Sequence, residues 1–341
     1  MRLAAIALLL ATVPLGGLGP AGLRAQDREP GTQGGCTAEG RAMSETTRAI
    51  AVTLGTATPG GGFPLYGAAV AETIHFVDPS LAVETRNTKG STENVPLLEQ
   101  GALDIALVQG EVASEALLGL GREPATLKIL AAMYSTPGMF VVRADSPYRT
   151  IRDLANKPVA FGARGSGLVI LSRYVLDGIG LDQDKDFQAI YLDRAGDGPA
   201  MVLDGRAAAL WGGGIGWPGF TAVAQGPAGA RFIAPSAEES MRIRARHPFL
   251  KPLTVPAGSY PGQTAPIESV GSWSFILARP TLDDETAYRL ARALHCGERA
   301  LAEKLPQARE TTAANTAAAA PRPDLIHAGV LRYLRELGLA P

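Results

Sequence analysis

Hydrophobic residues in the first half of this chain form short runs typical of strands, separated by stretches with helical periodicity. The expected strands are 51–54, 81–85 and 105–108, and the expected helices are 65–76 and 94–99. Ser91 and Thr92 precede the second of these helices, and we expect their hydroxyls to cap its free N–H groups. Alternation of strand and helix predicts a parallel sheet covered by helices.

A second alternating set follows residue 143. Before it, two β-rich stretches, 127–134 and 139–142, are separated by Pro137 and Gly138, which predict a break between two strands. The later expected strands are 159–161, 189–192, 208–211, 231–233, 253–255 and 272–277, and the later expected helices are 169–177, 198–204 and 217–224. The last part of the chain is helical. We infer two lobes, the first formed by residues 48–142 and 256–341 and the second by residues 143–255.

Two glycine-rich turns each lie between a strand-like run and a helix-like run, at 55–64 and at 161–167. Turns of this kind remove side chains and direct backbone N–H groups toward whatever lies above the next helix N-terminus, which favours an anion. Two such turns predict that the two lobes face one ligand, and a small carboxylate fits them best.

The N-terminus has the layout of a signal peptide. Arg2 precedes an uncharged run over 3–23 whose front half is strongly apolar, and a cut after Ala25 fits the small residues there. An uncleaved membrane anchor is the alternative, but prolines and glycines break the second half of the run and favour cleavage. We therefore expect a signal peptide over 1–25, a flexible polar leader over 26–47, and a periplasmic protein.

Composition places the mature chain among ordinary soluble globular proteins. It keeps 316 of the 341 residues, enough for two lobes with cores of their own. The net charge is -1, 46% of residues are hydrophobic, and the basic residues are dispersed. No nucleic-acid partner is expected.

Cys36 and Cys296 are the two cysteines of the chain. In an exported protein they can form one disulfide between the mature N-terminus and a late helix. The alternative is two separate thiols, and the sequence leaves the choice open because it does not show whether the two Cα atoms come close enough.

Catalytic patterns are poorly represented, so we expect a binding protein rather than an enzyme. The four histidines, at 75, 247, 295 and 327, have no spacing typical of a metal pair or of a nucleophile's base. The turn at Ser166 lacks the Gly-x-Ser-x-Gly elbow, and neither glycine-rich turn matches a phosphate-binding loop or a dinucleotide fingerprint. We expect no cofactor and no metal; a periplasmic hydrolase is the alternative from another functional class.

Five blocks of the sequence resemble the TAXI-type solute-binding subunits of TRAP transporters. The blocks occur in family order and are 55–67, 87–94, 103–109, 162–167 and 257–262. The resemblance covers about residues 51–337. It implies a type II periplasmic-binding-protein fold with a ligand cleft between two α/β lobes joined by hinge strands. It also implies a monomer that delivers an organic acid, such as glutamate or 2-oxoglutarate, to a fused large membrane permease. A receptor of an ABC transporter for a sulfonate or a thiamine precursor shares the fold and is the nearest alternative.

Carried over residue by residue, the resemblance implies a ligand site drawn from both lobes. Its members are Thr56, Thr58, Gly61, Gly62, Phe63, Ser91, Asn94, Gln109, Ser166 and Gly167. Leu168 departs from the pattern, because many relatives have a threonine there. Carboxylates at Glu72, Asp104 and Glu111 are interpreted as structural or solvated.

Three further residues are candidates on their own chemistry. Arg164 either clamps a ligand carboxylate in a bidentate way or faces solvent. Trp217 follows an unusually glycine-rich run and either walls the pocket or packs in the core. Tyr134 precedes the expected break at Pro137, so its phenol is expected to reach the ligand, with a satisfied core tyrosine as the alternative.

Overall fold

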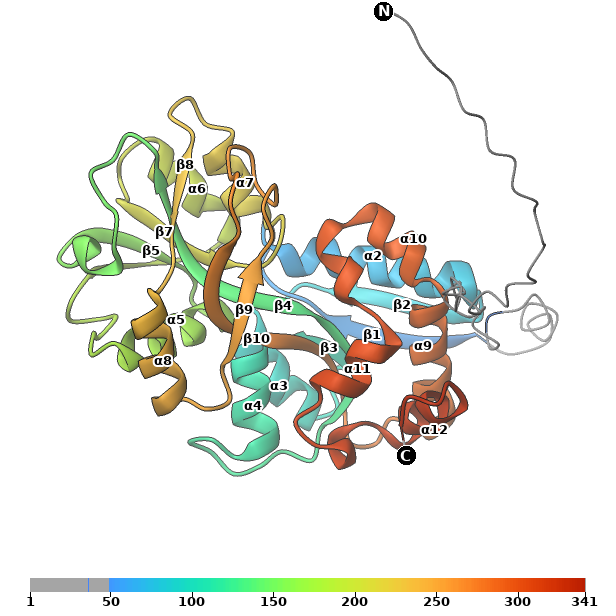
Figure 1. Ribbon diagram of the computed structural model, residues 1–341. Helices are drawn as coiled ribbons and strands as arrows, with labels where there is room; N and C mark the ends of the chain where they lie inside the picture. The colour runs from blue at the N-terminus through green and yellow to red at the C-terminus, as the bar shows by residue number, and fades with distance from the viewer. Residues whose placement is uncertain (1–35, 37–48, 341) are drawn as a thin grey trace, which may run out of the picture. The chain divides into compact units, whose positions relative to one another are not determined.

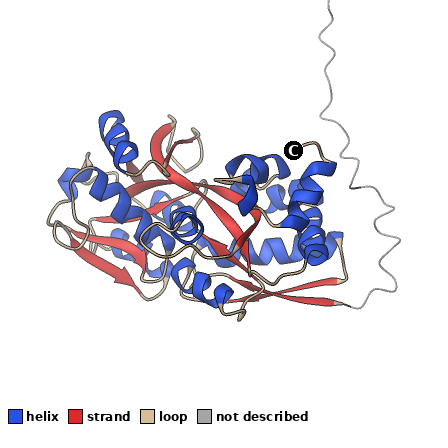
Figure 2. Ribbon diagram, turned by 90° about the horizontal axis from the view of Figure 1, so that it is seen from below, coloured by secondary structure: helices blue, strands red, loops and turns tan. Residues whose placement is uncertain are grey.

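The computed structural model describes residue 36 and residues 49–340, and these form a ten-stranded sheet with helices packed along it (Figures 1 and 2). Its main path has the strand order β2-β1-β3-β10-β4-β7-β5-β6, while β8 pairs with β4 and β9 with β10. The predicted signal peptide and, apart from Cys36, the predicted leader lie outside the described residues.

The first lobe consists of three parallel strands and the helices packed on them. The strands are β1 (Ile50–Gly55), β2 (Leu81–Arg86) and β3 (Ile105–Val108). Its helices along this part of the chain are α2 (Gly62–Val77), α3 (Ser91–Glu99) and α4 (Gly110–Leu118). The strands predicted here are confirmed: β3 has the predicted bounds, β1 is longer by one residue at each end, and β2 is longer by one residue at its C-terminal end. Helix α4 was missed because its apolar residues follow a buried strand almost without a turn.

Two long antiparallel strands, β4 (Lys128–Arg143) and β10 (Ile267–Ala278), run between the two halves of the sheet (Figure 1). The predicted break at Pro137 and Gly138 is wrong, because β4 continues through both. Pro137 is paired with Gly271 at the end of the ladder with β10, and Gly138 starts the ladder with β7. Proline is tolerated where pairing changes from one partner to the next, because one ladder hydrogen bond fewer is needed there.

The second lobe consists of three further parallel strands and the helices packed on them. The strands are β5 (Pro158–Ala163), β6 (Gln188–Leu192) and β7 (Ala209–Gly213), with β8 (Ala230–Ile233) beside β4 and β9 (Lys251–Val255) beside β10. The helices are α5 (Gly167–Gly178), α6 (Gly198–Leu203), α7 (Pro218–Ala224) and α8 (Ala237–Arg246). All but α8 were predicted. The lobe boundaries at 143 and 256 stay a prediction.

The C-terminal helices return to the first lobe, where α9 packs on α2 and α12 packs on α9. They are α9 (Asp284–Cys296), α10 (Glu298–Lys304), α11 (Ala313–Ala319) and α12 (Ala328–Glu336). A disulfide joins Cys36 to Cys296 at the end of α9, with the two Cα atoms 5.5 Å apart. The structure thus resolves the choice that the sequence left open in favour of the bridge.

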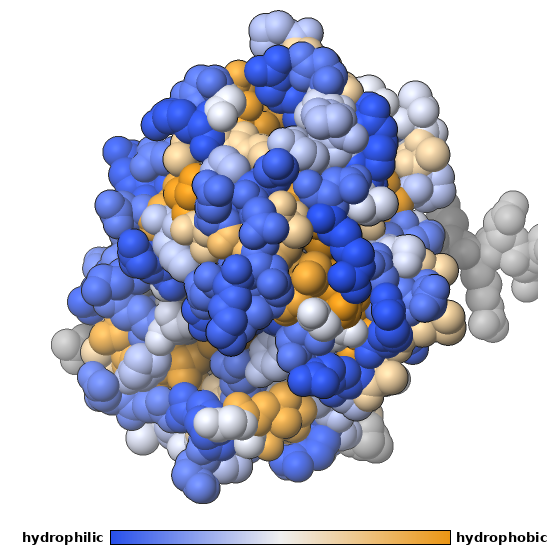
Figure 3. Space-filling view, turned by 90° about the vertical axis from the view of Figure 1, so that its left-hand side faces the viewer, coloured by the Kyte–Doolittle hydropathy of each residue, from blue (hydrophilic) through white to orange (hydrophobic). Residues whose placement is uncertain are grey.

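Hydrophobic side chains gather in buried clusters on both halves of the sheet. On the face seen in Figure 3, hydrophobic residues form separate patches between hydrophilic ones. No helix of the described residues is both long and apolar enough to cross a membrane. The parallel strands of both lobes end toward the same space, since β1, β3, β5 and β7 are each followed by a residue or loop that lines one cavity.

Candidate ligand-binding site

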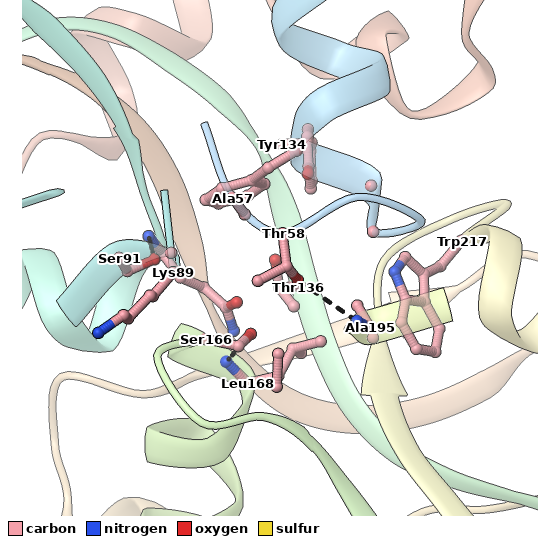
Figure 4. A pocket seen from close by; sticks show the side chains of 17 residues that line it. Ala57, Thr58, Lys89, Ser91, Tyr134, Thr136, Ser166, Leu168, Ala195 and Trp217 are labelled. Carbon is pink, nitrogen blue, oxygen red and sulfur yellow. Dashed lines mark hydrogen bonds between the residues drawn. The ribbon is translucent and has the colours of Figure 1, made fainter. Parts of the chain in front are cut away.

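A cavity between the two lobes has an empty volume of about 550 Å³, including the part that is open to solvent. Residues from both lobes and from β4 line it: Ala57, Thr58, Gly61, Gly62, Phe63, Lys89, Gly90, Ser91, Gln109, Tyr134, Thr136, Ala163, Ser166, Leu168, Ala195, Gly213 and Trp217. Figure 4 shows Ser91, Ser166 and Leu168 on one side and Ala195 and Trp217 on the other.

On one side of the cavity, the loop after β1 contacts the loop after β6 so closely that a side chain does not fit between them. We call such a contact between the lobes a seam. The backbone N–H of Ala195 donates a hydrogen bond to Thr58 Oγ1 at 3.3 Å (Figure 4). Beside it, a Cβ atom at Gly60 would lie 2.7 Å from the Cα of Gly196, and Gly60 has a φ of +83°. Glycine is therefore required at residue 60 both by conformation and by the closeness of the other lobe.

A second seam lies across the cavity, where the start of α3 meets the turn before α5. The backbone N–H and the hydroxyl of Thr92 both donate to the carbonyl oxygen of Gly165, at 3.2 and 3.0 Å. A Cβ atom at Gly90 would lie 2.7 Å from the same oxygen. The two lobes are therefore in contact on both sides of the cavity, which is the arrangement of a closed cleft.

Four helices begin at the cavity. The N-cap residues of α2, α3, α4 and α5 are Gly61, Gly90, Gln109 and Ser166, and each of them lines it. In the first three, no side chain caps the helix. Each helix N-terminus carries a positive partial charge and N–H groups without intrahelical partners, so the four together favour an anion.

Gln109 adds a side-chain donor to these helix ends. Its side chain is 4% exposed, and its Nε2 atom is buried without a hydrogen-bond partner. Its backbone N–H donates to Ser91 Oγ at 3.0 Å, which fixes the start of α4 against the start of α3. A buried, unpaired amide that lines a cavity is costly unless a ligand or water accepts from it.

The predicted capping of α3 by Ser91 and Thr92 is wrong. The N-cap of α3 is Gly90, with a φ of +121°, and neither Ser91 nor Thr92 caps the helix. Their hydroxyls make the contacts to Gln109 and Gly165 instead. The sequence signal for a cap therefore reflected residues that fasten α3 to its neighbours.

Trp217 walls the cavity, and glycines before and after it in the sequence leave room for its ring. Cβ atoms at Gly212 and Gly219 would lie 2.5 and 2.4 Å from ring atoms of the indole. Its backbone N–H donates to the hydroxyl of Tyr260 at 3.3 Å, and Tyr260 in turn contacts the carbonyl oxygen of Gly214. The glycines leave space for the ring, and the block at 257–262 supplies the residue that orients it.

The long strand β4 supplies Tyr134 and Thr136 to the cavity. The ring of Tyr134 packs edge-on against Tyr66, with ring centroids 5.2 Å apart. Burial raises the pKa of the Tyr134 hydroxyl, so the phenol stays neutral. Thr136 Oγ1 is 3.3 Å from Ser274 Oγ of β10. Both side chains are uncharged.

Nine of the predicted residues line the cavity: Thr58, Gly61, Gly62, Phe63, Ser91, Gln109, Tyr134, Ser166 and Trp217. Two others shape the first loop from behind. The carbonyl oxygen of Thr56 accepts from Asn94 Nδ2 at 2.8 Å, and this amide also donates to the carbonyl oxygen of Leu107. Thr56 and Asn94 are both fully buried and neither lines the cavity, and the Asn94 Oδ1 atom has no hydrogen-bond partner. Both residues support the first loop, and direct contact of either with a ligand stays a prediction.

Arg164 and Gly167 also lie outside the cavity lining. Arg164 is exposed, with its guanidinium 5.6 Å from the ring centre of Tyr191, which favours the solvent-facing alternative over a carboxylate clamp. Gly167 is buried at the seam, where a Cβ would lie 2.5 Å from the Cβ of Gln109. Its role is the close approach of α5 to α4.

Several lining residues were not predicted. They are Ala57, Lys89, Gly90, Thr136, Ala163, Leu168, Ala195 and Gly213. Most are small, and small residues give no chemical signal in a sequence. Lys89 is exposed, and Figure 4 shows its amine directed away from the other labelled residues. It therefore lines the cavity without presenting its charge to it.

Glu111, interpreted from the sequence as structural or solvated, is fully buried behind the lining. Its Oε2 accepts from Ser272 Oγ at 2.6 Å, while its Oε1 has no partner and lies 3.0 Å from where a Cβ of Gly167 would be. Burial raises the pKa of Glu111 to about 8, so the carboxyl is largely protonated at neutral pH. The structural interpretation is therefore the right one of the two.

None of the lining residues is an aspartate, a glutamate or a histidine. Within the described part of the chain, no group of three or more histidine, cysteine or carboxylate side chains is placed to hold a metal ion. The chemistry offered by the cavity is hydrogen bonding by neutral backbone, amide and hydroxyl groups between apolar walls.

A sequence-family model described as the NMT1-like family matches residues 54–338. The chain belongs to the NMT1-like family. The match spans both lobes of this NMT1-like protein and every residue that lines the cavity.

Solved structures that align with this chain differ widely from it in sequence. A protein from Bordetella bronchiseptica RB50 aligns with a TM-score of 0.51 and 15% identity, over 85% of this chain and 82% of the other. A structure described as a periplasmic transporter aligns with a TM-score of 0.51 and 12% identity, over 86% and 94%. The alkanesulfonate-binding protein SsuA from Xanthomonas axonopodis pv. citri, bound to MOPS, aligns with a TM-score of 0.47 and 18% identity, over 86% of each chain. The first two similarities support the fold class: this NMT1-like protein has the two-lobed α/β fold that the sequence predicted.

Proposed function

We propose that this protein is a periplasmic solute receptor that binds a small organic anion between its lobes and delivers it to a membrane transporter. The observation that carries the proposal is the convergence of four helix N-termini on one cavity, together with the buried and unpaired Gln109 amide. Partial positive charges and free donors at one place match a carboxylate or another small anion.

The two seams account for capture. A ligand held among helix ends of both lobes stabilises the arrangement in which they touch, at Thr58 with Ala195 and at Thr92 with Gly165. Opening the seams releases the ligand, and closing them creates a surface that a membrane partner can distinguish from the open form. The resemblance to TAXI-type subunits supports a TRAP transporter with a fused large permease as this partner, and the predicted signal peptide supports export.

A thermal-shift screen of the mature protein tests the proposal. The ligands are small carboxylates, amino acids, sulfonates and pyrimidines. A ligand that binds only the folded state adds about 2.7 kcal/mol of apparent stability at a hundredfold excess over its dissociation constant. We expect an organic anion to raise the melting temperature, and a screen in which no anion does so contradicts the proposal.

The same screen distinguishes the partner. A response to sulfonates or pyrimidines alone would favour the ABC-transporter alternative over the TRAP assignment. A fused permease gene adjacent to the gene of this protein favours the TRAP assignment, and an adjacent ATPase gene contradicts it. The hydrolase alternative requires turnover of a bound ester or amide that is lost in Ser166→Ala.

A further inference from the structure

We infer that the ligand is an acid without an ammonium group, so that amino acids are rejected in favour of 2-oxo, 2-hydroxy or unsubstituted acids of the same skeleton. The inference rests on the proposed function and names the substrate class of that cavity. It excludes glutamate, one of the ligands that the sequence left open. Three observations carry it.

The first observation is the donor character of the lining. The hydroxyl oxygens of Thr58, Ser91 and Ser166 each accept a backbone N–H, at 3.3, 3.0 and 3.2 Å. A hydroxyl that already accepts directs its own O–H proton elsewhere, so these side chains are available to donate. Gln109 Nε2 adds a further donor without a partner. An ammonium group has three donors and no acceptor, so it leaves all of these donors without a partner, whereas a carboxylate, oxo or hydroxyl oxygen accepts from them.

The second observation concerns charge. No aspartate or glutamate lines the cavity, whereas four positive helix ends do. A cationic group inside would therefore be repelled by the same partial charges that attract the carboxylate, and burying it without a counter-ion is costly.

The third observation concerns Glu111, a buried carboxyl next to two residues of the seam, which does not serve as a counter-ion. Glu111 lies behind Gln109 and Gly167, has no exposed surface, and is not a lining residue. Its burial also keeps it largely protonated, as its raised pKa of about 8 shows. It offers no negative charge to a ligand in the cavity.

Matched ligand pairs that differ in the amino group test the inference by isothermal titration calorimetry on the mature protein. The pairs are 2-oxoglutarate and glutamate, pyruvate and alanine, 4-methyl-2-oxopentanoate and leucine, and ethanesulfonate and taurine. Wherever at least one member of a pair binds, we expect the amino-free acid to bind at least tenfold more tightly than its amino counterpart. An amino acid that binds as tightly as its partner overturns the inference and leaves the proposed function intact. A complete absence of binding by any of these anions contradicts both.

Two variants of Gln109 add a readout that a purely structural role would not change. Gln109→Glu places an acceptor in the cavity, and we expect it to narrow the preference for the amino-free member of a pair at least threefold. Gln109→Leu is the matched control, which removes the donor without adding charge; it should weaken both members and keep their ratio. An unchanged ratio in folded Gln109→Glu overturns the inference.

Discussion

Thr58 of the first lobe accepts a hydrogen bond from the backbone N–H of Ala195 of the second lobe, and Gly60 meets Gly196 beside it with no room for a side chain. Contact between the lobes at this seam therefore depends on the close approach of the two glycines, and we expect a side chain added at Gly60 to keep the lobes apart. The proposed ligand lies behind the seam, so affinity and closure are expected to change together.

Gly60→Ala is expected to weaken ligand binding at least tenfold, because its Cβ would lie 2.7 Å from the Cα of Gly196. Gly101→Ala is the matched control. Gly101 has a similar positive φ of +71°, but a Cβ there meets nothing within 4 Å. Each substitution should cost about 1–2 kcal/mol of stability through backbone strain, measured by urea unfolding. Equal affinities of the two variants, measured by calorimetry, would contradict the role of the seam.

Arg164→Ala is expected to leave the affinity for both monocarboxylates and dicarboxylates within about twofold of the original. The guanidinium lies over Tyr191 and not among the lining residues, so its charge is largely screened from a ligand by solvent. Calorimetric titration with glutarate and with pentanoate measures this. A loss confined to the dicarboxylate would restore the clamp that the sequence suggested.

Glu111→Gln is expected to change how stability depends on pH. The folded protein holds the Glu111 proton up to a pKa of about 8, whereas the unfolded chain releases it near the ordinary value of 4.5. Between these values the folded state binds more protons, so this group makes the free energy of unfolding fall as pH rises, by at most about 1.4 kcal/mol per pH unit. The variant should lack that contribution, so its stability relative to the original protein should increase from pH 5 to pH 8 in urea unfolding.

Glu303→Gln, on the exposed surface of α10, is the control for this comparison. Its stability should follow that of the original protein at every pH. If Glu111→Gln also shows a constant difference between pH 5 and pH 8, the carboxyl does not titrate in this range and the account of its burial is wrong.

Removal of the disulfide should lower stability without changing ligand affinity. Cys36→Ser combined with Cys296→Ser frees the N-terminal segment from the end of α9, and losses of roughly 2–4 kcal/mol are typical for such bridges. Neither cysteine lines the cavity. Thermal unfolding and calorimetric titration of the double variant measure the two quantities. A drop in affinity at a temperature where the variant is folded would show that the bridge also positions the site.

The sequence predicted the strands and the glycine-rich loops well because both depend on local chemistry. Gly61, Gly62 and Ser166 were predicted from the turns that contain them. A turn between a strand and a helix directs backbone N–H groups toward the helix start, and this local geometry does not depend on where the other lobe lies. Predictions that depended on long-range contacts did less well. Pro137 did not break its strand, because the partner strand changes at that residue.

Residues that face each other across the seams carry little signal in the sequence. Ala195 and Gly196 are important because they contact Thr58 and Gly60. These partners lie about 135 residues earlier in the sequence, and only the fold brings them together. Asn94 has the chemistry of a ligand contact, but its amide nitrogen donates to two carbonyl oxygens of the protein and the residue lies outside the cavity lining. Side-chain type alone does not separate a residue that touches ligand from one that shapes the loop.

Hydrogen–deuterium exchange of the mature protein, with and without an anion that raises its melting temperature, tests the central claim most directly. The account predicts slower exchange in the first turns of α2, α3, α4 and α5, which follow Gly61, Gly90, Gln109 and Ser166, since the N–H groups of these turns that lack intrahelical partners surround the proposed ligand. Protection confined to other segments, with these four helix starts exchanging as before, would contradict it.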